Sequence, residues 1–382
     1  MHHDSAGEVL WSNAADWLGF TPGPGDNVVI PHGLTVILDE DARDLGTLAI
    51  HGTLKVADDR DLTLSADNVL VFGALEAGTE TEPHVHDFDV VLTGEAADPD
   101  IVLADWSHGH MHGHDHHGHM MEAIDNKALI VAPGGTLDLH GAETVSWTQL
   151  EATALTGATS IEVTDASGWQ IGDTISIAPT GLDAFEVEDR VITSIDGNTV
   201  GFDEPLAHRH NGTQQDVGDG RLLDMRAEVA NLSRTVTIRG EADPDLQILE
   251  TNSEHEGAFA RAGYGGHVMV LNDTEVRIDG VEFAELGISG EVGRYPLHFH
   301  HSGDMTGSYV RDASVHHSLQ RGIVVHQTDN LLVEDNVVYD VMSHGIYIED
   351  GVETGNRFDG NLVMLPRSTH NDFRIDEVRI NL

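Results

Sequence analysis

Apolar and polar residues alternate in short runs through most of the chain, and helical periodicity is nearly absent. Gly, Asp, Asn and Pro separate these runs, which is typical of a protein built from many short strands. In the first hundred residues the runs are 28–30, 34–38, 48–56, 62–64, 69–75 and 90–92. The pattern predicts an all-β fold.

A five-residue pattern recurs within these runs, as IHGTL at 50–54 and VFGAL at 71–75. Its glycines, Gly52 and Gly73, lie 21 residues apart, and a looser copy occupies 131–137. A period of roughly 20–30 residues matches one coil of a β-solenoid. The repeat therefore favours stacked coils over a β-sandwich.

The C-terminal third of the chain aligns with itself. Residues 296–300 match 322–326 at an offset of 26, and these match 345–349 at an offset of 23. A second run follows each copy, at 310–315, 333–338 and 358–363. Two strands and two turns per repeat predict the coils of a parallel β-helix.

These repeats divide the chain into two expected domains. We expect an N-terminal β-domain over 8–133 and the parallel β-helix over 134–382, with a small β-subdomain inserted at about 151–212. The inserted segment has short strands around turns, shows no chemistry of its own, and is assigned a structural role.

Strand alternation fixes which side chains of the helix share a face. It predicts an inward set of Leu297, Phe299, Ile323, Val325, Ile346 and Ile348, and an outward set of His298, Val324 and Tyr347. His300, His326 and Glu349 then form a second outward column. Successive strands lie about 4.8 Å apart, so neighbouring members of this column could meet a common ion or sugar.

Two histidines and a carboxylate are a familiar set of metal ligands. The predicted metal site contains His300, His326, Glu349 and His344, with calcium or zinc as the suspected divalent metal and no organic cofactor. Calcium would rely more on Glu349, Asp350 and backbone oxygens. The alternative is a solvated polar column whose histidines stack and hydrogen-bond.

The same cluster offers groups for cleaving a glycosidic bond, and the predicted catalytic residues are Glu349, Asp350, His298 and Tyr347. In a hydrolase, Glu349 and Asp350 would supply the acid and base. In a lyase, a cation would neutralise a uronate while His300, His326 or Tyr347 moves the proton. Arginines expected to bind the substrate are Arg294, Arg311 and Arg321.

The chain carries 66 acidic and 19 basic residues, a formal net charge of −47. Such a surface suits a saline setting and argues against nucleic acid, whose phosphates require Lys and Arg contacts. It would also repel a polyanion unless salt or bound cations intervene. Cysteine is absent, which excludes disulfides and thiolate metal sites.

Residues 107–119 contain seven histidines in a glycine-rich segment. Metal capture is one interpretation, since neutral imidazoles bind zinc, copper or nickel. We favour a low-complexity insertion that binds metal only adventitiously, because such a run fixes no ligand geometry. A metal-scavenging protein is the weakest of the functions considered.

Several motifs together resemble the eight-glycine domain proteins of the cell-migration-inducing hyaluronidase and transmembrane hyaluronidase family. The opening likeness is Trp11-Ser12 followed by GPGDNVVIPHG at 23–33. Further matching segments are 137–141, 146–148, 168–173, 226–229, 232–234, 265–267, 295–300, 309–312, 314–317 and 349–351. The resemblance runs from about residue 10 to 365 and suggests a bacterial-type relative.

This resemblance implies an eight-glycine domain packed on a right-handed β-helix, with hyaluronan binding or depolymerisation and, in the membrane-anchored relative, calcium dependence. No catalytic set is carried over from the family. The chain departs from it in lacking cysteine, in its histidine-rich segment and in ending soon after the similar region.

Taken together, the sequence predicts an extracellular protein that binds and cleaves a hyaluronan-like or other uronate-containing polysaccharide. The alternative is a non-catalytic carbohydrate-binding or adhesion module of a larger surface protein. A secreted or cell-surface location is expected without a membrane span, although no signal peptide is visible. The export route and the oligomeric state stay open.

Overall fold

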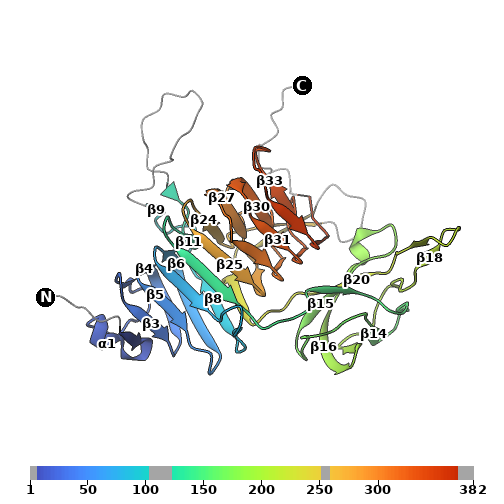
Figure 1. Cartoon of the computed structure of the whole chain (residues 1–382), viewed down its shortest axis with the longest axis horizontal. Coiled ribbons are helices and arrows are strands. Elements are labelled where there is room, and N and C mark those ends of the chain that lie inside the picture. Colours follow the sequence, from blue (N-terminus) through green and yellow to red (C-terminus); the bar gives the residue numbers. More distant parts are fainter. Residues whose placement is uncertain (1–6, 103–122, 251–258, 369–382) are drawn as a thin grey trace.

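The computed structural model describes residues 7–102, 123–250 and 259–368. Strands dominate these residues, and the helical elements among them are η1 (Trp11–Asn13), α1 (Ala14–Trp17) and η2 (Ala184–Glu186) (Figure 1). This confirms the predicted all-β class. No helix within the described ranges has the length and apolar character needed to cross a bilayer.

Two long sheets of mostly parallel pairing run along the body of the molecule, and we call them sheet A and sheet B. Sheet A contains β1 (Glu8–Leu10), β3 (Thr35–Leu38), β5 (Thr53–Val56), β7 (Ala74–Ala77), β12 (Thr136–His140), β25 (Glu275–Asp279), β28 (Tyr309–Arg311), β31 (Leu332–Glu334) and β34 (Arg357–Asp359). Sheet B contains β2 (Val28–Ile30), β4 (Ala42–Ile50), β6 (Leu62–Val71), β8 (Phe88–Leu92), β11 (Ala128–Val131), β21 (Val236–Gly240), β24 (His267–Val270), β26 (Val281–Ala284), β27 (Leu297–Asp304), β29 (Ser314–His316), β30 (Ile323–Asp329), β32 (Val337–Tyr339), β33 (Ile346–Ile348) and β35 (Leu362–Met364). Strands from both expected domains therefore lie in the same two sheets.

Each C-terminal coil has three strands, as in β27, β28 and β29, so the prediction of two strands per coil is wrong. The second run of each repeat bends in its middle and contributes two of the three. Asp312 and Asp335 occupy this corner with φ of 51° and 53°, and Gly280 and Gly360 occupy it with φ of 62° and 64°. Asp and Gly tolerate the left-handed region better than other residues, and an alternation pattern does not reveal such a bend.

One hydrophobic core runs through the coils, from Trp11 near one end to Val341 near the other. Leu297, Phe299, Ile323 and Val325 are fully buried in it, as the alternation predicts. Burying a side chain of this size stabilises the fold by about 1.5–3 kcal/mol.

Ile348 departs from the predicted inward set, because its side chain is 42% exposed. It lies in β33, which ends the order of strands in sheet B. On that side of β33 no further strand of the described ranges covers it.

The glycine repeat has a steric cause. A Cβ on Gly73 would lie 1.9 Å from the carbonyl oxygen of Gly52, and one on Gly52 would lie 2.2 Å from that of Leu34. The residues preceding these glycines, His51 and Phe72, stack with their ring centroids 4.5 Å apart. Backbone from successive coils thus meets too closely at this corner for any residue with a side chain.

The inserted subdomain is an antiparallel sheet with its own hydrophobic cluster, and lies beside the solenoid in Figure 1. Its strands extend from 147 to 231, beyond the predicted limits of 151–212. They are β13 (Trp147–Gln149), β14 (Ser160–Glu162), β15 (Thr174–Ile177), β16 (Glu188–Asp196), β17 (Thr199–Phe202) and β20 (Glu228–Asn231). The side chain of Ser146 anchors its entry to the solenoid by donating to Asp312 Oδ1 at 2.9 Å.

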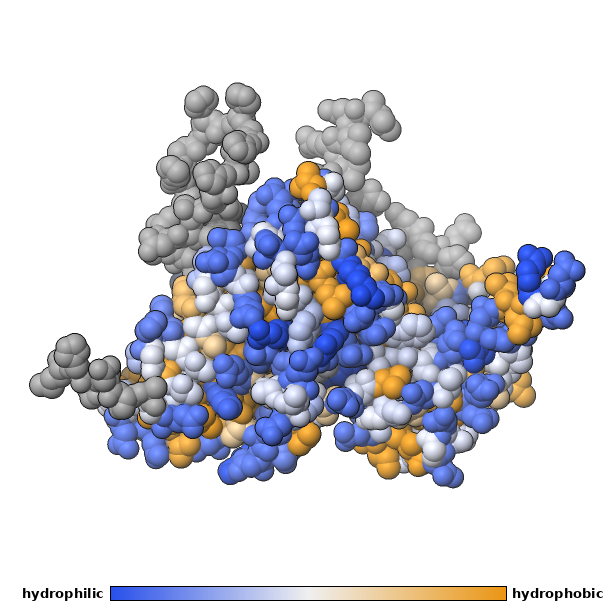
Figure 2. Space-filling model, viewed as in Figure 1, coloured by the Kyte–Doolittle hydropathy of each residue, from blue (hydrophilic) through white to orange (hydrophobic). Residues whose placement is uncertain are grey.

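Three short antiparallel pairs complete the described elements: β9 (Ile101–Val102) with β10 (Ala123–Ile124), β18 (Gln215–Asp216) with β19 (Leu222–Leu223), and β22 (Gln247–Glu250) with β23 (Phe259–Ala262). Most of the face in Figure 2 is hydrophilic, in keeping with the acidic composition (Figure 2). The outer face of sheet B has an apolar area where Ile130 and Met269 pack against Ile101 and Ile124 of the β9–β10 pair. This pair therefore shields part of the outer face from water.

Replacing Gly73 by alanine should destabilise the fold by about 3 kcal/mol or more, because backbone and not a flexible side chain blocks the added methyl group. Urea unfolding followed by circular dichroism measures the change. Gly23→Ala is the matched control, since its Cβ would find only an ordinary contact at 3.7 Å with Asp26. Equal midpoints for the two variants would contradict the steric explanation.

Candidate functional site

The predicted outward column forms on β27, β30 and the residue after β33. β27 and β30 pair in parallel with His300 opposite His326, and β30 pairs with β33 with Val325 opposite Ile348. Glu349 then follows, and its backbone N–H donates to the Val325 carbonyl at 3.0 Å. The predicted register of these three residues is confirmed.

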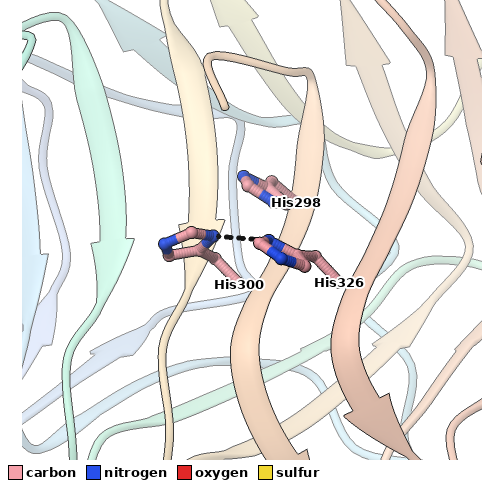
Figure 3. Close-up of side chains that lie close together, drawn as sticks. All are labelled: His298, His300 and His326. Atoms are coloured by element: carbon pink, nitrogen blue, oxygen red, sulfur yellow. Dashed lines mark hydrogen bonds between the residues drawn. The ribbon is translucent and has the colours of Figure 1, made fainter. Parts of the chain in front are cut away.

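His298 joins this column from the neighbouring outward position of β27 (Figure 3). His298, His300 and His326 each place one ring nitrogen within 4.8 Å of the other two. The Nδ1 atoms of His300 and His326 are 3.2 Å apart. Glu349 Oε2 lies 3.9 Å from His298 Nε2 and 3.8 Å from His326 Nδ1.

Two of these imidazoles are held by their second nitrogen. His298 Nδ1 lies 2.9 Å from the carbonyl oxygen of Gly293, and His326 Nε2 lies 3.1 Å from Asp350 Oδ2. Both partners are acceptors, so in each ring the nitrogen facing them carries the hydrogen. Burial lowers the pKa of His298 to about 3, which keeps this ring neutral.

Glu349 is largely buried beside the imidazoles, and burial raises the pKa of its carboxyl above the usual range. Arg321 NH1 lies 3.8 Å from Glu349 Oε1. The same nitrogen donates to the Tyr295 hydroxyl at 3.0 Å, and the guanidinium lies 4.2 Å from the centroid of the Tyr347 ring. One carboxylate oxygen therefore faces a cation, while the other faces two histidines.

A cavity of about 190 Å³ opens beside these groups. Its polar wall includes the three histidines and Glu349. The remaining lining residues are Ile124, Met269, Val292, Gly293 and Arg294. Arg294 forms an ion pair with Asp125 at its edge. The cavity thus combines an apolar wall with converging imidazoles, as binding sites for small ligands commonly do.

Gln327 and Glu353 contact Asp350, the partner of His326, and the sequence did not identify them. Glu353 Oε1 accepts from the backbone N–H groups of Gln327 and Asp350, at 3.0 and 3.2 Å. Gln327 also donates to Asp350 Oδ2 at 3.0 Å, and this hydrogen bond lowers the pKa of Asp350. The offset of 23 between these two coils aligns Gln327 with Asp350 and was an available signal for Gln327, whereas the repeat does not align Glu353 with it.

His344 is not part of the histidine group, contrary to its predicted place in the metal site. Its Nδ1 atom lies 2.7 Å from the Ser343 hydroxyl, and its ring lies 4.8 Å from that of Tyr347. The side chain is exposed. His298 takes the place in the group that the sequence assigned to His344.

Arg311 is likewise not near this cavity, so its expected proximity is wrong. It lies on β28 in sheet A, where it pairs with Asp279 at 2.8 Å and with Glu80 at 3.0 Å. Position in the sequence does not separate the faces of a coil, and this residue belongs to the face next to the predicted one. The histidine-rich segment 107–119 lies entirely outside the described residues, between Val102 and Ala123.

Arg311 instead lines a cleft of about 890 Å³ between sheet A and the inserted subdomain. The buried His140 lies at its wall, with Nε2 at 2.7 Å from Asp138 and Nδ1 at 3.7 Å from Asp279. Burial alone would lower the pKa of His140, but the hydrogen bond to Asp138 and the negative charge of the nearby Asp279 outweigh it and raise the pKa to about 9. The ring is therefore cationic at neutral pH.

Comparison with known proteins gives two family matches. Residues 11–151 match the G8 domain, and residues 263–378 match the CEMIP beta-helix. Every side chain of the histidine group, together with Glu349, falls within the second match.

Two curated relatives and one solved structure are similar to the chain. Human fibrocystin-L is 34% identical over 392 residues, which cover 94% of this chain and 9% of that protein. The cell surface hyaluronidase of Danio rerio is 36% identical over 218 residues, which cover 53% of this chain and 15% of that protein. The chain thus spans less than a sixth of either relative. A tailspike of Acinetobacter baumannii bacteriophage AP22, solved with a capsular saccharide, aligns with 78% of this chain and 53% of its own at 12% identity and a TM-score of 0.24.

Replacing His140 by glutamine should lower the free energy of unfolding by about 3 kcal/mol near pH 6 and by much less near pH 10. The folded-state pKa lies above the ordinary value of 6.5, so the stabilisation is complete below pH 6.5 and is lost as the pH rises through 9. Urea unfolding across this range measures it, with the exposed His32→Gln as control. A destabilisation that is the same at both pH values would contradict the ionic origin.

Proposed function

The chain carries a G8 domain and a CEMIP-type β-helix, as its sequence motifs predict, and from this premise we propose that it binds an extracellular polysaccharide and cleaves it at the histidine cavity. The expected substrates are hyaluronan-like or other uronate-containing chains. The observation that carries the proposal is the convergence of three imidazoles and a buried carboxylate on one cavity of the outer face. All of them lie in the part of the chain that matches the CEMIP beta-helix.

The charge of the protein supports a site of this composition. At a net charge of −47 the surface repels polyanions, so a uronate needs a local positive charge in order to bind. Arg294 and Arg321 already face Asp125 and Glu349, which leaves little cationic charge for a ligand. A divalent cation bound at the imidazoles would supply that charge and polarise the bound group.

Glu349 is the residue expected to move a proton in this reaction. Its Oε2 atom is buried and has no hydrogen-bond partner among the described residues. Asp350 is already engaged, since its Oδ2 atom accepts from both His326 and Gln327. The two carboxylates are therefore poorly matched as an acid/base pair for hydrolysis, and the arrangement favours elimination with one proton-transfer group beside a cation.

Glu349→Gln should reduce polysaccharide cleavage by about 100-fold or more, because the amide keeps the shape but cannot accept the proton. The test incubates the protein with hyaluronan and other uronate-containing polysaccharides, with added calcium, added zinc or a chelator. Absorbance of unsaturated ends reports elimination, and a reducing-end assay reports total cleavage. The matched control is Glu162→Gln, an exposed carboxylate in the inserted subdomain, which should keep the parental rate.

Three outcomes would go against parts of this proposal. New reducing ends without unsaturated ends would favour hydrolysis over elimination. Binding of a polysaccharide without cleavage under any metal condition would make the protein a carbohydrate-binding module. If the protein neither binds nor cleaves any polysaccharide of the panel, the proposed function is wrong.

A further inference from the structure

We propose that His298, His300 and His326 bind one divalent ion of the zinc class, with a coordination position left open toward the cavity beside Glu349. This inference deepens the function proposed above and rests on it only for the identity of the ligand that would occupy the open position. The ion itself is argued from the hydrogen-bond partners of the imidazoles.

The tautomer of His298 is fixed by its backbone partner. The Gly293 carbonyl can only accept, so Nδ1 carries the hydrogen and Nε2 presents a lone pair. His298 Nε2 is buried, and no hydrogen-bond partner for it exists among the described residues. The atom it faces at 3.9 Å, Glu349 Oε2, is also buried, unpartnered and an acceptor. Two buried acceptors without a shared donor are unfavourable unless a cation or another donor lies between them.

His326 repeats this arrangement from the next coil. Its Nε2–H donates to Asp350 Oδ2, which turns the lone pair of Nδ1 toward His300 Nδ1 at 3.2 Å. Imidazoles that bind a metal usually donate their second N–H to a backbone carbonyl or a carboxylate, which fixes the tautomer and the ring orientation. His298 and His326 use one partner of each kind.

The composition and spacing of the donors select the class of ion. Zinc–nitrogen bonds of about 2.0–2.1 Å in a tetrahedral site place ligand atoms roughly 3.4 Å apart. The separation of 3.2 Å between His300 Nδ1 and His326 Nδ1 is close to that value. Calcium takes six to eight oxygen ligands, whereas this cluster offers three imidazoles and a single inward-facing carboxylate oxygen. Nitrogen donors favour zinc, copper or nickel over calcium.

This geometry changes two of the roles predicted from the sequence. Asp350 becomes a positioning residue that holds the His326 ring and does not act as the acid. Glu349 becomes the neighbour of the open coordination position. Its other oxygen, Oε1, lies 3.8 Å from Arg321 NH1. Three protein ligands with an open fourth position are the arrangement of catalytic zinc sites, whereas four protein ligands mark structural ones.

The test measures metal binding without any glycan, so that its result is separate from that of the cleavage assay. The full chain is used with the seven histidines of 107–119 replaced by glutamine, which removes a competing source of imidazoles. Competition with a chromophoric chelator should give one Zn²⁺ per chain with a Kd of about 1 µM or tighter. Cobalt in place of zinc should give a visible absorption band of a nitrogen-ligated, low-coordinate site.

His298→Gln and His326→Gln should each weaken zinc binding by about 100-fold and abolish the cobalt band, and Asp350→Asn should weaken it by about 10–100-fold. His344→Gln is the matched control, a nearby exposed histidine outside the group, and should change nothing. If buried His298→Gln fails to fold in a chelator-treated thermal melt, His326→Gln decides, because its ring is partly exposed. Zinc binding that survives both histidine substitutions, or that millimolar calcium displaces, would overturn the proposal. Zinc binding without any cleavage would leave this site standing and remove only the proposed reaction.

Discussion

Hydrogen bonding in register between consecutive coils is the constraint on which the rest of this molecule depends. Parallel pairing of β27 with β30 sets Leu297 against Ile323 and His300 against His326, about 4.8 Å apart. Whatever a position carries in one coil therefore meets its counterpart in the next. Inward columns must be apolar along their whole length, and outward columns bring side chains of similar chemistry together. A repeated histidine is thus converted into a cluster by backbone geometry alone.

The same stacking explains how so acidic a chain holds its coils together. Arginines on one coil pair with aspartates on the adjacent coil, as in Arg239–Asp89 at 3.0 Å, Arg277–Asp138 at 3.1 Å and Arg311–Asp279 at 2.8 Å. A planar guanidinium suits such ladders, since it can donate to a carboxylate with two N–H groups. These partly exposed pairs each contribute little to stability. Their main effect is to relieve repulsion between stacked carboxylates.

The sequence predicts the features that follow from the repeat period, such as strand register. It does not predict features that depend on a bend in the backbone or on burial by a segment distant in the sequence. The offsets of 26 and 23 were sufficient to place His300, His326 and Glu349 in one column, because register follows from periodicity. The third strand of each coil was missed, since a left-handed residue such as Asp312 leaves the alternation intact while turning the chain.

The composition of the histidine group depends on elements that periodicity does not describe. His298 is buried although it points outward, and the group contains it rather than His344, because the segment near Gly293 lies over that end of β27. Arg311 was assigned to the wrong face for a related reason. Its distance along the chain from Arg321 is short, but Arg311 lies on β28 of sheet A, whereas Arg321 precedes β30 of sheet B. Burial of a side chain by a distant segment and its assignment to one sheet of the solenoid are non-local properties, and no pattern within one repeat encodes them.

Burial by neighbouring segments also determines the chemistry of the histidine column. An outward position of a β-helix is normally solvated, and water satisfies any imidazole or carboxylate there. Here Ile124 of the β9–β10 pair and Val292 line the cavity beside the column, and His298 Nε2 and Glu349 Oε2 are buried without a hydrogen-bond donor among the described residues. Burial of this kind costs about 1–3 kcal/mol for each unsatisfied group. The continuous hydrophobic core beneath the site offsets that cost. The unsatisfied atoms would then bind a cation more tightly than the same residues would in a solvent-exposed column.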